Sequence, residues 1–184
     1  LRLLRLKNIN DLLISTTIYL RITKKNSEVI PFHRENFYND FDYINNQLNI
    51  NIPISDHGKY LYYIEKSHLI TDKEIKFVKI NSKSSNIKRF STSHKIGLPY
   101  NPKIIQNLNE LGKLKMFNSK ICYAHAFSSR LLHGNGINNT DKVRISLDFG
   151  IIPKNENSKK NKKFHFASYH VSKKHYLPIA ELNS

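Results

Sequence analysis

Short runs of β-branched and aromatic residues alternate along this chain with clusters of Asn, Ser, Gly and Pro. Such runs predict strands, and the clusters between them predict turns and loops. The predicted strands cover residues 16–22, 60–64, 75–80, 121–127, 143–152 and 164–171. Many short strands separated by turn residues favour a sandwich or jelly roll over a parallel α/β sheet. We therefore expect a mainly β fold, a double-stranded β-helix (jelly roll) with a cavity between two sheets.

Two segments have apolar residues at helical spacing and predict one or two short helices in this β fold. The first covers residues 103–114 and follows Pro102, and the second covers residues 37–48. With 184 residues, the chain is long enough to form one domain with its own core. We expect a single jelly-roll domain over residues 1–184.

Several simple features of the composition exclude classes of protein. The single cysteine, Cys122, excludes an intrachain disulfide and a Cys-rich zinc site. No apolar run is long enough to cross a bilayer, and residues 1–7 are too short and too charged for a signal peptide. These features predict a cytoplasmic protein with no membrane partner. Because the chain begins with Leu1 rather than Met, we also expect that an N-terminal segment is missing.

The strongly basic composition raises the question of nucleic-acid binding. The formal net charge is +16, but the lysines are scattered except in residues 158–163. A short lysine run of this kind is typical of a solvated loop. We therefore do not expect a nucleic-acid partner, and a non-catalytic basic module that binds nucleic acid stays only as an alternative.

The candidate chemistry lies in two segments 100 residues apart, one with His33 and Glu35 and the other with His133. Residues two apart on a strand project to the same face, so His33 and Glu35 can reach one ion. Two imidazoles and one carboxylate suit Fe(II) and leave the opposite side of the ion open. His133 is the preferred third ligand because it precedes a Gly-Asn-Gly turn, where a strand end can point into a cavity. His125 is the rival third ligand.

A second pattern follows eleven residues after His133. On the predicted strand, Arg144, Ser146 and Asp148 fall on one face, and the apolar residues between them fall on the other. An Arg and a Ser on an inward face can hold a carboxylate through a forked pair of charge-assisted bonds and a hydroxyl. This arrangement predicts an anchor for a dicarboxylate co-substrate.

These residues together resemble the motifs of the Fe(II)/2-oxoglutarate-dependent oxygenases. More narrowly, the chain is similar to the phytanoyl-CoA-hydroxylase-like branch and to small oxygenases of bacterial carbohydrate gene sets. His33-Arg34-Glu35 matches the family's His-x-Asp/Glu, His133 matches its distal His, and Arg144 with Ser146 matches its 2-oxoglutarate anchor. The resemblance covers residues 14–153 and is strongest over residues 133–149.

The resemblance implies an oxygenase that acts on a small polar molecule, such as a sugar or glycoside, with Fe(II), 2-oxoglutarate and molecular oxygen. Fe(II) would be bound by His33, Glu35 and His133, and the far carboxylate of 2-oxoglutarate by Arg144 and Ser146. No catalytic residue is expected beyond the metal ligands. 2-Oxoglutarate would be converted to succinate and carbon dioxide while a substrate C–H bond is oxidised.

The chain departs from the family pattern in two ways. Glu35 stands where Asp is commoner, and its extra methylene changes the reach of the carboxylate. The chain is also short, so the N-terminal helices that usually buttress the larger sheet are expected to be missing. A cupin-type dioxygenase or a sugar epimerase, which need no 2-oxoglutarate, stays as the alternative among jelly-roll enzymes.

Overall fold

The computed structural model describes residues 11–16, 18–27, 31–38, 46–55, 60–81, 100–154 and 176–178. Strands dominate this part of the chain, as the alternation of apolar and polar residues predicts. They are β1 (Leu12–Ser15), β2 (Tyr19–Thr23), β3 (Leu48–Pro53), β4 (Leu61–Ile64), β5 (Phe77–Asn81), β6 (Tyr100–Ile104), β7 (Leu114–Met116), β8 (His125–Ser128), β9 (His133–Asn135), β10 (Arg144–Pro153) and β11 (Tyr176–Pro178).

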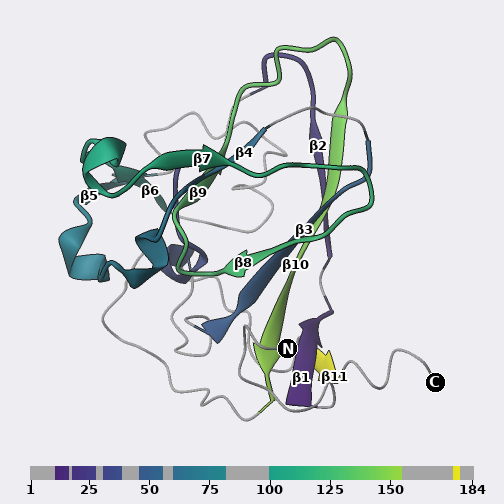
Figure 1. Ribbon diagram of the computed structural model, residues 1–184, viewed down its shortest axis with the longest axis horizontal. Coiled ribbons are helices and arrows are strands. Elements are labelled where there is room, and N and C mark those ends of the chain that lie inside the picture. Colours follow the sequence, from purple (N-terminus) through teal and green to yellow (C-terminus); the bar gives the residue numbers. More distant parts are fainter. Residues whose placement is uncertain are drawn as a thin grey trace.

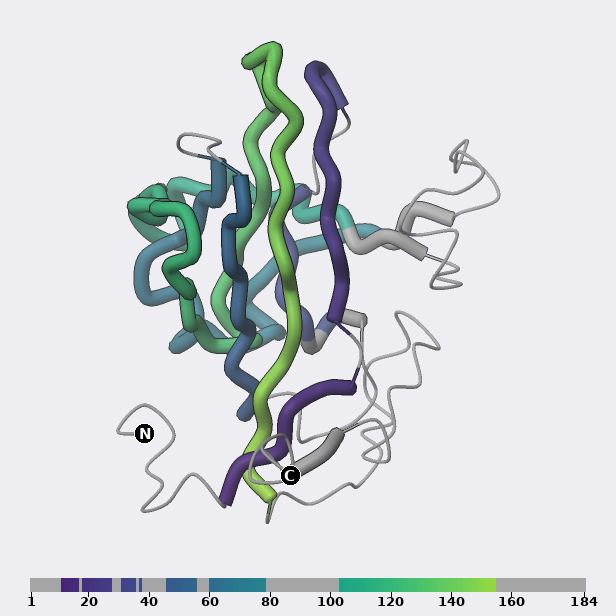
Figure 2. Tube along the Cα trace, turned by 90° about the vertical axis from the view of Figure 1, so that its right-hand side faces the viewer, coloured from purple at the N-terminus to yellow at the C-terminus, as the bar shows by residue number. Residues whose placement is uncertain are grey.

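A large antiparallel sheet has β10 at its centre. The strand order is β11-β1-β10-β3-β8, and β2 pairs with the first half of β10 on the same side as β1. Figure 2 shows β2 and β3 running along opposite sides of the long β10. Because β10 is bordered on both sides, its residues Arg144 and Ser146 lie inside the sheet rather than at its edge.

A smaller antiparallel sheet has the order β7-β4-β9 (Figure 1). An isolated bridge between His33 and His133 adds the segment around His33 to the outer side of β9. A separate hairpin pairs β5 with β6. The two larger sheets, both antiparallel, make this a jelly roll and confirm the predicted fold class.

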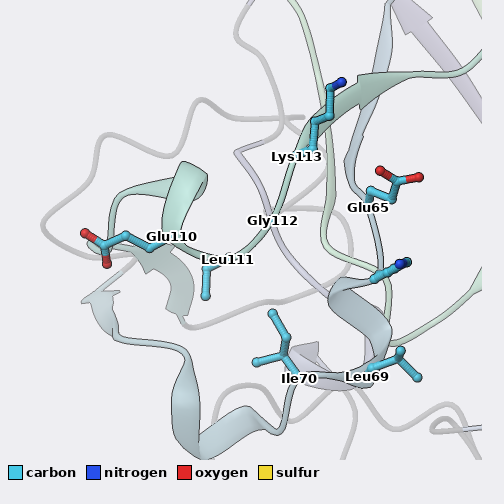
Figure 3. A pocket seen from close by; sticks show the side chains of 8 residues that line it. Glu65, Leu69, Ile70, Glu110, Leu111, Gly112 and Lys113 are labelled. Carbon is cyan, nitrogen blue, oxygen red and sulfur yellow. The ribbon is translucent and has the colours of Figure 1, made fainter.

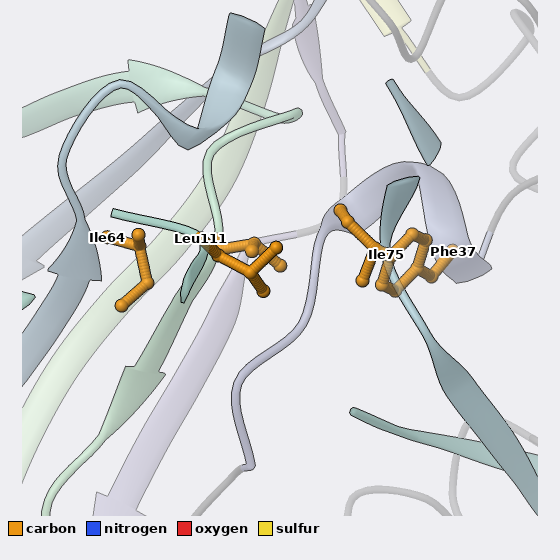
Figure 4. Packing of buried hydrophobic residues seen from close by; sticks show 5 residues of the cluster. Phe37, Ile64, Ile75 and Leu111 are labelled. Carbon is orange, nitrogen blue, oxygen red and sulfur yellow. The ribbon is translucent and has the colours of Figure 1, made fainter. Parts of the chain in front are cut away.

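Apolar residues gather in two clusters beside the smaller sheet. One cluster consists of Phe37, Ile64, Ile75, Leu111 and Leu132 (Figure 4). Ile64 and Leu132 are fully buried in it. A second cluster contains Tyr60, Leu61, Phe127 and Leu131. Burial of these side chains from water is the main favourable term that holds the sheet and its loops together.

The predicted helix over residues 103–114 is wrong. This segment contains the end of β6, a short 3-10 helix η7 (Leu108–Glu110) and the start of β7. Gly112 interrupts it with a φ of +138°, and a Cβ there would meet the backbone oxygen of Glu65 at 2.7 Å. This backbone conformation is open to glycine and not to a continuous helix. The local apolar spacing was therefore overridden by strand pairing on both sides.

The predicted helix over residues 37–48 is also wrong where it can be compared. The chain forms a 3-10 helix η3 (Glu35–Tyr38), and Leu48 already belongs to β3, while residues 39–45 lie outside the described residues. Two further 3-10 helices, η5 (Ser67–Leu69) and η6 (Asp72–Glu74), follow β4. In the part of the chain that the structure describes, every helix is of this short 3-10 kind.

The strand predictions are correct for four segments, shifted for one, and outside the described residues for one. Residues 60–64, 75–80 and 143–152 contain β4, β5 and β10 at nearly the expected positions, and residues 16–22 contain most of β2. In the 121–127 segment, the strand begins only at His125, after a turn in which Cys122 has a φ of +63°. The predicted strand over residues 164–171 lies outside the described residues.

Candidate metal centre

His33, Glu35 and His133 converge at one point of the molecule. One possible ligand atom from each residue lies within 4.8 Å of the other two. The two histidines are held by a pair of backbone hydrogen bonds, from His33 N–H to the His133 carbonyl at 2.9 Å and from His133 N–H to the His33 carbonyl at 3.1 Å. Directly opposed residues of an antiparallel pair project to the same side. This pairing therefore brings together two imidazoles from segments 100 residues apart.

Glu35 reaches the same point from the first residue of η3 rather than from a strand. Its backbone N–H donates to the Ser129 carbonyl at 3.0 Å, where the chain turns away from the bridge. The Glu35 Oε1 atom lies 3.5 Å from His33 Nε2 and 3.6 Å from His133 Nε2. The expectation that His33 and Glu35 share a strand is thus wrong, although the turn still places both side chains in one site.

Both imidazole rings are oriented by backbone carbonyls. His33 Nδ1 donates to the Pro31 carbonyl at 2.8 Å, and His133 Nδ1 donates to the Leu131 carbonyl at 2.9 Å. Because a carbonyl can only accept, each Nδ1 carries a proton, and Nε2 is the ring nitrogen that faces Glu35. This is the arrangement by which proteins fix the tautomer and direction of metal-binding histidines.

The protonation states at this site suit a cation. Burial and the neighbouring His133 ring lower the pKa of His33, so its imidazole is held neutral. Burial alone would raise the pKa of Glu35, but the interactions with His133 and His33 outweigh this effect and lower it. A neutral imidazole and an ionised carboxylate are the forms that bind a metal ion.

Arg34, between His33 and Glu35, holds this segment in place through contacts on the side away from the candidate site. Arg34 is fully buried and donates to the Asp72 carboxylate, to the Ser67 carbonyl and, at 2.9 Å, to the Ile70 carbonyl. These three acceptors lie on η5, η6 and the turn between them. Since Arg34 projects away from the site, its contacts tie the His33–Glu35 segment to the apolar cluster.

Arg144 and Ser146 are both buried on the inner face of the large sheet, with 6% and 3% of their surfaces exposed. Arg144 donates from Nη1 to the Gly136 carbonyl at 2.8 Å and from Nη2 to the Ile137 carbonyl at 2.9 Å. Its guanidinium carbon lies 5.2 Å from the centre of the Tyr60 ring. Both predicted anchor residues thus face the interior, although Arg144 already uses its two terminal nitrogens.

The remaining donor of Arg144 has chemistry that fits a carboxylate. Its Nε–H is buried and has no hydrogen-bond partner among the described residues, and no described carboxylate pairs with its charge. Burial lowers the pKa of Arg144 because it disfavours the charged form. An unpartnered donor and an uncompensated charge beside a buried Ser146 are what an added anion would satisfy.

Arg21 and Asn51 on the same inner face, together with Tyr60 from the segment before β4, form a connected chain with Asp148. Arg21 Nε donates to Asp148 Oδ2 at 2.7 Å, Asn51 Nδ2 donates to Asp148 Oδ1 at 2.6 Å, and the Tyr60 hydroxyl donates to Asn51 Oδ1 at 3.0 Å. Sequence analysis missed Arg21 and Asn51. The signal for Asn51 was the alternation of Asn with Ile in β3, which places Asn49 and Asn51 on one face.

His125 does not join the metal cluster. It lies on β8 opposite Asn51, its Nε2 is 3.2 Å from Ser119 Oγ, and its ring packs on Phe117 at 5.1 Å between centroids. The neighbouring inward residue Phe127 instead contacts the His133 ring edge-on at 4.7 Å. The group of possible metal ligands therefore contains His133 and not His125 among the described residues.

A separate hollow lies beside η5 and η7 (Figure 3). Its lining residues are Glu65, Lys66, Leu69, Ile70, Glu110, Leu111, Gly112 and Lys113. None of the five predicted site residues lines it. Glu65 pairs with Lys115 at 2.6 Å, an exposed ion pair of a kind that contributes little to stability.

Comparison with known proteins gives the fold of this chain. No protein-family model matches it, and no curated protein matches it in sequence. One match is the solved structure of SnoK, a non-heme alpha ketoglutarate dependent carbocyclase from nogalamycin biosynthesis. Its TM-score is 0.55 and its sequence identity 10%, and the match covers 84% of this chain and 56% of the SnoK chain. A second match is EvdO2 from Micromonospora carbonacea var. aurantiaca, complexed with 2-oxoglutarate. Its TM-score is 0.51 and its sequence identity 10%, and the match covers 86% of this chain and 59% of the EvdO2 chain.

A third match is the epimerase SnoN in complex with Fe3+, alpha ketoglutarate and nogalamycin RO. It has a TM-score of 0.50 and 15% identity, and covers 79% of this chain and 52% of that chain. This chain thus spans little more than half the length of the proteins it matches. Among the described residues, no helix is long and apolar enough to cross a membrane. At these identities the comparison establishes that the chain shares the jelly-roll fold of these enzymes.

Proposed function

We propose that this protein is an Fe(II)- and 2-oxoglutarate-dependent oxygenase of the phytanoyl-CoA-hydroxylase-like branch. Its substrate would be a small polar molecule, with a carbohydrate as the leading class, and molecular oxygen would be consumed. The observation that supports this most is the convergence of His33, Glu35 and His133, with both Nε2 atoms directed at one carboxylate. Two imidazoles and a carboxylate with open positions suit non-heme Fe(II).

Each of the five proposed residues has a defined task. His33, Glu35 and His133 would hold the metal on one side and leave the other side free. Arg144 would bind the far carboxylate of 2-oxoglutarate through its unpartnered Nε–H, with the Ser146 hydroxyl beside it. The iron and 2-oxoglutarate, when bound, would supply the oxidation chemistry, and the protein would supply ligation and orientation.

The surrounding structure supports these tasks without taking part in the chemistry. The Pro31 and Leu131 carbonyls hold the rings in the tautomer that leaves Nε2 free. Phe127 covers one edge of the His133 ring and excludes water from that side. The stack of Arg144 on Tyr60 and its two carbonyl contacts fix the guanidinium plane. Such supporting contacts determine how precisely the metal and co-substrate are placed.

The test is anaerobic titration of the purified chain with Fe(II) and 2-oxoglutarate, followed through the weak visible charge-transfer band of the chelate. We expect the band in the unchanged protein and its loss in His133→Ala, with metal affinity reduced at least about 100-fold because a direct ligand is removed. His125→Ala is the matched control and should keep the band. Iron binding without the band would favour a jelly-roll enzyme that needs no 2-oxoglutarate.

A further inference from the structure

The strand β2 has an inverted pattern of apolar and charged residues. Leu20 and Ile22 are 57% and 55% exposed, whereas Arg21 between them points toward the inner face of the large sheet. A strand that borders a core normally buries its apolar residues and exposes its charges. Departures of this kind are expected at functional sites.

Arg21 lies at the level of the proposed co-substrate anchor. It is the residue directly opposite Ser146 in the β2·β10 pair, and Thr23 is opposite Arg144. Directly opposed residues share a face, so Arg21 and Ser146 project into the same space between the sheets. Arg21 therefore belongs to the wall of the candidate site, although the proposed function gives it no task.

The hydrogen bonds of Arg21 leave part of its guanidinium free. Nε donates to Asp148 at 2.7 Å, and the two terminal nitrogens have no hydrogen-bond partner among the described residues. The side chain keeps 29% of its surface exposed. The bond at Nε fixes the plane of the group, so the terminal nitrogens form an oriented fork that matches the oxygens of an anion.

The charged side chains of β2 and β10 near Ser146 have a net positive charge. Arg21 and Arg144 contribute two positive charges and Asp148 one negative charge, so the three sum to +1. Burial opposes the charge on Arg21, but Asp148 and, more weakly, Glu35 stabilise it and raise its pKa.

We propose that Arg21 is a second anion-binding arginine on the inner face of the large sheet, whose terminal nitrogens bind a carboxylate, phosphate or sulfate group of a ligand held beside the candidate metal centre. The anion has two possible sources, the far carboxylate of 2-oxoglutarate or an anionic group on the primary substrate. The identity of the first source rests on the proposed function, whereas the presence of an anion site at Arg21 does not.

The first arm of the test compares two 2-oxo acids that differ only at their far end. 2-Oxoglutarate carries a carboxylate there and 2-oxopentanoate a methyl group, and both are titrated with Fe(II) without oxygen. If Arg21 binds the co-substrate, Arg21→Gln lowers the affinity for 2-oxoglutarate at least about tenfold. The affinity for 2-oxopentanoate stays unchanged, because only 2-oxoglutarate loses a charge-assisted bond. Loss of affinity for both would indicate general damage to the site and count against the proposal.

The second arm uses inorganic sulfate and needs no metal. Calorimetric titration of the metal-free protein is expected to show saturable sulfate binding that Arg21→Gln weakens at least about tenfold. If Arg21→Gln loses affinity for sulfate but keeps its affinity for 2-oxoglutarate, the anion that Arg21 binds belongs to the primary substrate. This arm keeps its meaning if the charge-transfer band never forms, so failure of the proposed function and failure of this inference are distinguishable.

Two variants separate anion binding from folding. Leu20→Gln changes an exposed neighbour on β2 and should leave both titrations unchanged. Arg21→Lys keeps the charge beside Asp148 but loses the fork, so it should fold and still bind both anions more weakly than the unchanged protein. The inference is overturned if the arginine variants bind 2-oxoglutarate and sulfate as tightly as the unchanged protein, because Arg21 would then serve only its ion pair with Asp148.

Discussion

Two buried regions of this molecule have opposite chemistry. The cluster of Phe37, Ile64, Ile75, Leu111 and Leu132 beside the smaller sheet is purely apolar. The inner face of the large sheet also carries buried side chains, but these are the polar residues Asn49, Asn51, Arg144 and Ser146, each at most 7% exposed. Apolar burial is favourable by itself, whereas buried polar groups cost free energy unless they are paired. Burial of the first region is favourable by itself, and the second region is where the proposed function places ligand binding.

The two buried arginines show the same difference at the level of single residues. Arg34 has the Asp72 carboxylate as a partner and two backbone carbonyls, so its charge is compensated within the protein. Arg144 has carbonyl partners only, and no described carboxylate pairs with it. A compensated charge is typical of a structural role, and an uncompensated one is typical of a site that receives an anion.

The largest expected effect on the stability side comes from Arg34→Met. It would leave the Asp72 carboxylate and the Ser67 and Ile70 carbonyls without their donor, so the free energy of unfolding should fall by about 4 kcal/mol. Urea unfolding measures this change. Arg130→Met is the control, because Arg130 reaches the Ile70 carbonyl only at 3.5 Å, and it should cost less than about 1 kcal/mol. Equal losses in both variants would contradict a special role of Arg34.

A smaller loss is expected from a cavity in the apolar cluster. Leu132→Ala removes a fully buried side chain and should lower the free energy of unfolding by about 3 kcal/mol. The affinity for Fe(II), measured on the folded protein, should change less than about tenfold because no ligand or its carbonyl partner is altered. Leu69→Ala, at a side chain that is 69% exposed, should change stability by less than about 0.5 kcal/mol. If Leu132→Ala lost more free energy of Fe(II) binding than of unfolding, the apolar cluster and the candidate metal centre would not be energetically separate.

The smallest expected loss of stability, with an effect on binding, comes from Asn51→Ala. Asn51 links Tyr60 to Asp148, and these two residues contact Arg144 and Arg21. Its loss should cost about 1–2 kcal/mol of stability and reduce 2-oxoglutarate affinity about tenfold.

The matched control for Asn51 is Asn49→Ala on the same strand and face. Asn49 accepts from Gln47 Nε2 at 2.6 Å, and in the part of the chain that the structure describes it makes no hydrogen bond to Tyr60 or Asp148. It should lose similar stability without the change in affinity. If the two variants bind 2-oxoglutarate with the same affinity, the hydrogen bonds of Asn51 on the inner face do not contribute to 2-oxoglutarate binding. Unfolding curves and anaerobic titrations on the same preparations provide both readouts.

The sequence by itself determined the fold class, the position of β10 and the inward direction of Arg144 and Ser146. These follow from a two-residue alternation, which is a local property of the chain. The residue types of the candidate site, two His and one Glu, were also readable without a structure. Local spacing failed at residues 103–114, where strand pairing and Gly112 overrode the helical pattern.

Only the tertiary structure decided which of these residues meet. The bridge between His33 and His133, the turn that brings Glu35 to them, and the pairing of Arg21 with Ser146 all join segments far apart in sequence. Register between distant strands depends on how whole sheets pack, and no local pattern encodes it. For that reason the sequence indicated the chemistry of the candidate site, while the place of Arg21 beside it became visible only in the folded chain.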